Sequence, residues 1–203
     1  SYVIAITVSI GSITIPQYVL RDGESSSSSP DRAYLNAIKK VEIGNGVTSI
    51  GDSAFYNCFS LLSIYIPNTV TSIGDSAFQY CSSLSFITIP NGVTNIDDNA
   101  FYNCYSLLSV AIPISVTSIG DHAFVGCVKL NSIVIPINVT SIGYHAFYGC
   151  DMLNSIVIPI SVTSIGEKAL PGVFNEWANE TTVYYRGTKA QWEMISIEDQ
   201  PYL

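Results

Sequence analysis

Apolar residues recur along most of this chain in one fixed pattern. The unit reads L-x-x-I-x-I-P-x-x-V-T-S-I-G-x-x-A-F-x-x-C-x-x and returns every 23 residues. Prolines and cysteines keep this period independently, in the series Pro67, Pro90, Pro113, Pro136, Pro159 and the series Cys58, Cys81, Cys104, Cys127, Cys150. Six units are visible, since the alanine of A-F recurs from Ala54 to Ala169. A repeat of this length predicts a solenoid, in which one unit cannot bury its own core.

Each unit predicts one coil. Its L-x-x-I-x-I opening favours a short strand of β-branched residues, and the proline that follows ends the strand because it cannot donate to a sheet. The V-T-S-I-G segment is expected to form a corner, and A-F-x-x-C a short helical or 3-10 turn on the opposite wall. The residues before the cysteines are expected to have positive φ, with Tyr80 departing from the pattern; they are Asn57, Asn103, Gly126 and Gly149.

Stacked coils would place identical residues in columns. Parallel strands lie about 4.8 Å apart, so six coils predict an array about 25 to 30 Å long. One face would be a parallel β-sheet and the other would carry the turns. An open end would expose the core and a strand edge, so both ends are expected to be covered.

Residues 1–40 are predicted to form an N-terminal β cap with a Ser-rich loop. The segment "YVIAITVSIGSITIP" alternates apolar and small polar residues, which favours strands, and a hairpin turning near Ser9 to Ser12 is one arrangement. Arg21 to Asp31 contains five consecutive serines and is expected to be a low-complexity loop. The N-terminus lacks the basic and continuous apolar regions of a signal peptide.

Residues 171–203 are predicted to form a C-terminal cap made of a strand and a helix. The strand is expected over Thr181 to Tyr185, and Thr188 with Gln191 three residues later has the arrangement of a capping box. The side chains expected to cover the last coil are Trp177, Trp192 and Ile195.

The segments "SVTSIGDHAFVGC" and "SIVIPINVTSIGYHAFYGC" resemble the BspA-like leucine-rich repeats, a class found mainly on bacterial surfaces and in some parasitic protists. The resemblance covers residues 41–170, and "TTVYYRGTKAQWEMI" is similar to the family's common C-terminal cap. It implies six leucine-rich repeats in an α/β solenoid with a right-handed superhelix, and a surface protein that binds macromolecules. The sequence departs from the family pattern at Gly44, Asp97 and Leu170, where the family has proline, glycine and phenylalanine.

Composition excludes several classes of protein. With 48% hydrophobic and 12% charged residues, the chain differs from disordered proteins. No apolar run approaches the roughly 20 residues needed to span a bilayer, so membrane insertion is not expected. A net charge of -8 would repel a phosphate backbone, which makes nucleic acid a poor partner.

The cysteine column favours buried free thiols over disulfides, because stacked positions have parallel Cβ vectors. No CxxC motif or His-Cys cluster suggests zinc, and no metal or cofactor is expected. His122 and His145 occupy equivalent positions in adjacent coils. A metal site or a pH sensor is one interpretation, but the same column holds Ser53 and Lys168, which favours a tolerant exposed position.

A column of aspartates precedes the A-F turns, formed by Asp52, Asp75, Asp98 and Asp121. The favoured interpretation is that each carboxylate caps the turn that follows it; a bridging Ca²⁺ is the alternative. The sequence contains no G-x-S-x-G motif and no phosphate-binding loop, so we do not expect an enzyme.

The outward positions of the predicted strands supply the candidate binding site. Exposed apolar groups that lie together mark binding or assembly sites, although such residues also suit strands in general. The candidate residues are Leu62, Tyr65, Phe86, Thr88, Leu108, Ala111 and Val134. A second, sparser candidate on the convex side consists of Tyr56, Tyr102 and Tyr148.

The sequence therefore predicts a non-enzymatic recognition or adhesion module, extracellular or at the cell surface, that binds a protein or glycan through its strand face. The alternative is a structural protein that self-assembles into oligomers or filaments through the repeat ends or the apolar face.

Overall fold

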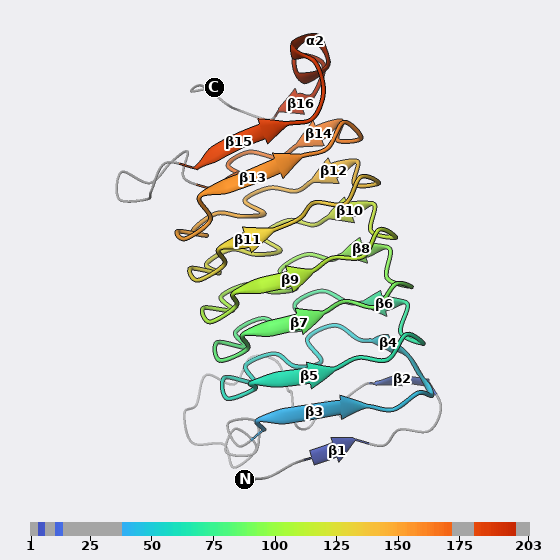
Figure 1. Cartoon of the computed structure of the whole chain (residues 1–203). Helices are drawn as coiled ribbons and strands as arrows, with labels where there is room; N and C mark the ends of the chain where they lie inside the picture. The colour runs from blue at the N-terminus through green and yellow to red at the C-terminus, as the bar shows by residue number, and fades with distance from the viewer. Residues whose placement is uncertain (1–3, 7–10, 14–37, 172–180, 198–203) are drawn as a thin grey trace.

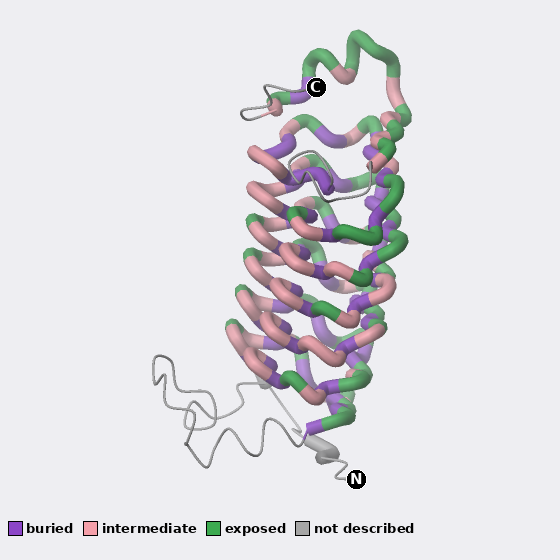
Figure 2. Tube along the Cα trace, turned by 90° about the vertical axis from the view of Figure 1, so that its left-hand side faces the viewer, coloured by how far each residue is buried: buried purple, intermediate pink, exposed green. Residues whose placement is uncertain are grey.

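Each repeat forms one coil with two short strands and a turn, and the coils stack into an elongated solenoid (Figure 1). The computed structural model describes residues 4–6, 11–13, 38–171 and 181–197. Buried and exposed residues recur at the same places from coil to coil (Figure 2). The predicted stack of about six coils with parallel strands is confirmed.

The first strands of the coils form one side of the stack, which we call the first sheet face. Its strands are β1 (Ile4–Ile6), β3 (Lys40–Ile43), β5 (Ser63–Tyr65), β7 (Phe86–Thr88), β9 (Ser109–Ala111), β11 (Ser132–Ile133), β13 (Ser155–Ile158) and β15 (Thr182–Tyr185). They pair in parallel in three hydrogen-bonded groups, β1-β3-β5, β7-β9-β11 and β13-β15.

A second parallel sheet occupies the segment for which the sequence predicted only a corner. Its strands are β2 (Gly11–Ile13), β4 (Val47–Ile50), β6 (Ser72–Ile73), β8 (Asn95–Ile96), β10 (Ser118–Ile119), β12 (Ser141–Ile142), β14 (Ser164–Ile165) and β16 (Ser196–Ile197). We call this side the second sheet face. In β4 the first and last residues, Val47 and Ile50, are buried while Thr48 is exposed, so the segment packs on the core. It also pairs in parallel with β6 of the next coil.

The remaining side, the turn face, differs from the predicted helical or 3-10 turns. The residue directly before each A-F pair and the residue directly before each cysteine have left-handed backbone, for example Ser53 with φ 55° and Asn57 with φ 63°. These interrupt any run of helical dihedral angles. Within the described ranges the one helix is α2 (Lys189–Trp192), so very little of the solenoid is helical.

The left-handed residues also orient the backbone for contacts between coils. The backbone N–H groups of Ser53, Phe55 and Asn57 donate to carbonyl oxygens of the next coil at 2.7 to 2.9 Å. The predicted positive φ before each cysteine is confirmed, and Tyr80 also adopts it, with φ 62°. The turn face is therefore a third ladder of backbone hydrogen bonds along the stack.

The core consists of columns of identical side chains. Phenylalanine rings stack along the axis with centroids 5.2 to 5.5 Å apart and interplanar angles of 3° to 8°. This column contains Phe55, Phe78, Phe101, Phe124 and Phe147, and Leu170 takes the same place in the last coil. Apart from Ile195, every buried hydrophobic residue of the described core lies between Ile38 and Leu170.

The N-terminal strands do not form the hairpin considered from the sequence. β1 pairs in parallel with β3, with Ile4 opposite Val41, and β2 pairs in parallel with β4. The two strands therefore belong to different sheets and continue both faces by one coil. The Ser-rich loop from Arg21 to Asp31 lies outside the described residues.

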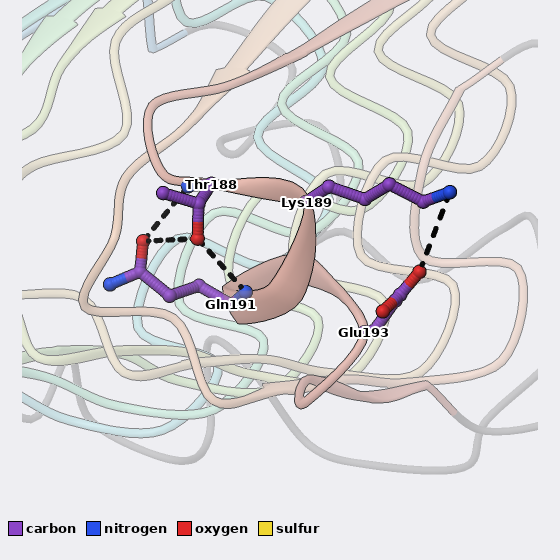
Figure 3. A network of polar contacts seen from close by, with 4 residues as sticks. All are labelled: Thr188, Lys189, Gln191 and Glu193. Atoms are coloured by element: carbon purple, nitrogen blue, oxygen red, sulfur yellow. Dashed lines mark hydrogen bonds and ion pairs between the residues drawn. The ribbon is translucent and has the colours of Figure 1, made fainter.

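At the other end, β15 pairs with β13 and β16 pairs with β14, again in parallel. The predicted capping box is confirmed: Thr188 Oγ1 accepts from the Gln191 backbone N–H at 3.2 Å, and the Gln191 side chain accepts from the Thr188 N–H at 2.8 Å (Figure 3). Ile195 is buried and Trp192 packs against the core. Trp177 lies outside the described residues, and the division of the chain at residues 40 and 170 stays a prediction.

None of the helices in the described part of the chain has the length and apolar character needed to cross a membrane.

Candidate functional site

The first sheet face presents the largest aromatic side chains of the predicted site to solvent. Tyr65 is 59% exposed and Phe86 is 58% exposed, and Leu62 also lies open. They belong to the adjacent strands β5 and β7 and to the turn that enters β5. Because strand residues alternate between faces, their neighbours Ile64 and Ile87 point to the core while these side chains point out.

The remaining predicted residues continue this surface toward the C-terminus. Thr88 lies directly opposite Ala111 in the paired strands β7 and β9, and both are exposed. Val134 follows β11 and is 77% exposed. Leu108 departs from the expectation, since it is only half exposed. The columns extend one coil further, because Tyr184 of β15 lies opposite Val157 and is exposed.

The first sheet face carries no charge over most of its length. Lys40 and Glu42, which pair at 2.6 Å, lie on β3 at its N-terminal border. From Leu62 to Tyr184 the described outward positions hold only Leu, Phe, Tyr, Ala, Val, Ser, Thr and Asn. The charge of the chain therefore lies elsewhere.

A second apolar feature was missed from the sequence. Ile114, Ile137 and Ile160 directly follow the prolines of three successive coils and are 60% to 67% exposed. We call them the isoleucine column. The signal was present in the pattern, because the same position holds Asn68 and Asn91 in the preceding coils.

The carboxylates of the aspartate column on the turn face accept hydrogen bonds from other backbone groups than those predicted. Asp98 Oδ1 accepts from the backbone N–H of Asp121 at 2.7 Å, and Asp121 Oδ1 accepts from that of Tyr144 at 2.7 Å. The carboxylates therefore bind the next coil, and the prediction that each caps its own turn is wrong. This geometry follows from the repeat, which places an equivalent N–H group one strand spacing away.

The aspartate column also concentrates negative charge. Partial burial, followed by repulsion from Asp98 and Asp52, raises the pKa of Asp75. Burial and then repulsion from Asp75 raise the pKa of Asp97, which stands where the other repeats have glycine. Among the described residues, no group of three His, Cys, Asp or Glu side chains is arranged to hold a metal ion.

The structure differs from the prediction that the histidine column is a tolerant exposed position, because both histidines are partly buried and have left-handed backbone. His122 and His145 are half-buried, have φ of 56° and 53°, and lie with ring centroids 5.5 Å apart. The His145 ring stacks between Tyr144 at 3.9 Å and Tyr148 at 4.9 Å. Its Nε2 is buried without a hydrogen-bond partner in the part of the chain described. Burial and then repulsion from His122 and Lys168 lower the pKa of His145.

The predicted tyrosines of the turn face belong to a longer row of rings. Tyr80 lies 5.7 Å from both Tyr56 and Tyr102, and Tyr102 continues to His122 at 6.5 Å. This second candidate is thus denser than the sequence indicated, but Tyr56, Tyr80 and Tyr102 contact one another edge-on and are half-buried.

The five cysteines are free and buried, as predicted. Four of them donate through Sγ to a phenylalanine carbonyl oxygen of the preceding coil at 3.2 to 3.3 Å. Burial raises the pKa of Cys58 and of Cys104 to about 12. These thiols are therefore structural groups of the core.

Comparison with known proteins connects these features to one family. The chain matches the BspA type leucine rich repeat region in six copies, over residues 8–130 and 48–175. No curated protein matches the chain in sequence.

Several solved structures have the same architecture. A leucine-rich repeat protein of T. pallidum is 29% identical with a TM-score of 0.68, and the match covers 79% of this chain and 73% of that one. A leucine-rich repeat protein of Bacteroides ovatus is 29% identical with a TM-score of 0.54, over 65% of this chain and 43% of that one. A leucine rich cell surface protein of Faecalibacterium prausnitzii is 26% identical with a TM-score of 0.50, over 81% and 65%.

Proposed function

The chain belongs to the family of BspA-type leucine-rich repeats, and from this membership we propose that it is a non-enzymatic recognition module. In this proposal it acts outside the cell or at the cell surface, where it binds a protein or glycan through the first sheet face. The description of the F. prausnitzii relative as a cell surface protein supports this location.

The observation that carries the proposal is the exposure of neighbouring aromatic rings on a rigid sheet. Tyr65 lies on β5, which pairs with β3, and Phe86 lies on β7, which pairs with β9. Both strands pack on a continuous core, so the positions of the two rings are set before any ligand arrives. A site ordered in advance loses little entropy on binding. Exposed aromatic side chains also dominate the free energy of many interfaces.

A pair of substitutions tests this assignment. We expect the double variant Tyr65→Ala, Phe86→Ala to lose at least about tenfold in affinity, because an interface anchor often contributes 2 kcal/mol or more. The measurement is binding to immobilised extracellular-matrix glycoproteins and mucins. The Tm should remain near that of the wild type, because surface substitutions usually change stability by less than about 0.5 kcal/mol.

The matched control is Tyr148→Ala, which removes an exposed ring from the turn face. It should bind as the wild-type protein does. Equal binding by the wild type and the double variant would refute the assignment of the first sheet face.

The isoleucine column favours a second function, which is self-association. Three β-branched apolar side chains in successive coils form a row that a second copy could cover. In this case Ile137→Asp should convert an oligomer into a monomer in sedimentation velocity runs at micromolar concentration. A wild-type protein that sediments as a monomer would exclude this function.

A further inference from the structure

The two sheet faces differ in how far their side-chain hydroxyl groups are hydrogen-bonded within the fold. On the second sheet face, four threonine hydroxyls donate to the threonine carbonyl of the preceding coil at 3.2 to 3.3 Å; the donors are Thr71, Thr117, Thr140 and Thr163. These groups are engaged by the fold itself. They form a row that adds to the contacts between coils.

On the first sheet face the serine and asparagine side chains are left without such partners, whereas the Thr181 hydroxyl donates to the Leu153 carbonyl oxygen at 2.7 Å. Within the described ranges, no side-chain hydrogen bond is made by Ser63, Ser109, Ser132, Ser155, Asn131 or Asn154. All six lie at outward positions and are exposed or half exposed. Hydroxyl and amide groups both donate and accept, so this surface offers unused hydrogen-bonding capacity of both kinds.

The distribution of charge limits the class of ligand that fits the first sheet face. The outward positions from Leu62 to Tyr184 are uncharged, although the whole chain carries a net charge of -8. A positively charged ligand would find no carboxylate on this face, and a polyanion would be repelled by the chain as a whole. The face is therefore complementary to an uncharged ligand.

The exposed rings complete this pattern. Tyr65, Phe86 and Tyr184 present apolar ring surfaces at 56% to 59% exposure. Phe86 stands in the serine row, opposite Ser109, whereas Tyr65 and Tyr184 stand in a neighbouring row of the same face. A sugar ring has an apolar C–H face and a rim of hydroxyl groups, so it matches both features at once. The repetition of each column from coil to coil suits a ligand made of repeating units.

We propose that the first sheet face binds a neutral polysaccharide, whose hydroxyl groups bond to the serine and asparagine columns while its sugar rings pack on Tyr65 and Phe86. This inference rests on the proposed function and specifies the ligand class for the same face. A protein ligand is the alternative outcome of the test.

Native affinity electrophoresis tests the inference. The protein is run through gels that contain a soluble β-glucan, a galactomannan or an arabinoxylan as neutral probes, or polygalacturonate as an acidic probe. At least one neutral polysaccharide should retard the protein, and polygalacturonate should not. Retardation should be the same at about 0.05 and 0.5 M NaCl, because screening affects only charged contacts.

Substitutions locate the binding. Tyr65→Ala with Phe86→Ala should weaken retardation at least tenfold, and Ser109→Ala with Ser132→Ala at least threefold. The matched control, Thr117→Val with Thr140→Val, removes two hydroxyls that the second sheet face already uses and should leave retardation unchanged.

The outcomes separate this inference from the proposed function. If no neutral polysaccharide retards the protein while a matrix glycoprotein still binds through Tyr65 and Phe86 after enzymatic deglycosylation, the inference is overturned and the proposed function stands. If a polysaccharide retards all variants equally, the first sheet face is not the binding site, and both the inference and the proposed function lose their assignment of that face. Retardation by polygalacturonate or loss of retardation in high salt would also overturn the inference.

Discussion

The thiol of Cys104 donates a hydrogen bond to the carbonyl oxygen of Phe78, which lies 26 residues earlier in the preceding coil, at 3.2 Å. The same bond joins Cys81 to Phe55 and Cys127 to Phe101. Each thiol thus occupies a buried position and also satisfies a backbone acceptor of its neighbour. This relationship explains why a column of cysteines is compatible with an absence of disulfides among them.

The thiols should be protected from modification in the folded protein. Burial raises the pKa of Cys58 and Cys104 to about 12, so almost no thiolate exists at pH 8, and the thiolate is the reactive form. A colorimetric disulfide reagent at pH 8 should therefore modify none of the cysteines quickly in native protein and all five in denaturant. Rapid modification of Cys104 in the native protein would contradict its buried role.

The phenylalanine column should be the largest single contributor to packing. Phe101 stacks on Phe78 and Phe124, and Phe101→Ala should destabilise the protein by about 3 to 5 kcal/mol in urea unfolding. Phe101→Leu should cost less than the alanine variant, since Leu170 fills the equivalent position in the last coil. A cost below about 1 kcal/mol for the alanine variant would show that the coils do not depend on this stack.

His145 should make the fold less stable in mild acid. Its pKa is lowered from 6.5 in the folded state, so the unfolded chain binds more protons once the pH falls below about 6.5. Stability should decline as pH falls through this range and level off below the folded-state pKa. The control is His145→Asn, because Asn99 holds the same column with φ 54°.

The comparison is the Tm of each protein at pH 7.5 and at pH 5.5. The Tm of the wild type should fall further than that of His145→Asn. Equal declines in the two proteins would mean that His145 does not titrate differently in the folded and unfolded states.

Asp97 should destabilise the protein at neutral pH. Its pKa is raised from 3.8, so folding disfavours its charged form, and this penalty is relieved as pH falls through the folded-state pKa toward 3.8. Asp97→Asn should therefore raise the Tm at pH 7, with a gain that shrinks near pH 4. Asp151→Asn removes an exposed charge outside the aspartate column and should change the Tm little. A gain independent of pH would contradict the electrostatic explanation.

Much of the fold was predictable because the 23-residue repeat places the same residue type at equivalent positions of successive coils. The buried place of Cys104, the left-handed backbone of Asn57 and the capping box of Thr188 and Gln191 each follow from residue type and spacing. The second sheet was not recognised, since strands of two residues such as β10 are too short to show alternation.

Contacts between coils were harder to predict than contacts within one. Asp98 binds an N–H group 23 residues later, which no local turn rule indicates. The left-handed φ of Ser53 was missed because serine carries no signal comparable to that of glycine. At the site, Tyr65 and Phe86 were predicted to be exposed and are, whereas the isoleucine column required comparison of one position across all coils.

The central claim, that the first sheet face contacts the ligand, is tested most directly by hydroxyl-radical footprinting. The wild-type protein is labelled with and without a saturating amount of the polysaccharide or glycoprotein that binds it. The ligand should protect Tyr65, Phe86 and Tyr184 and leave Tyr148 and Met152, both exposed, labelled as before. Protection of Tyr148 together with unchanged labelling of Tyr65 and Phe86 would contradict the account.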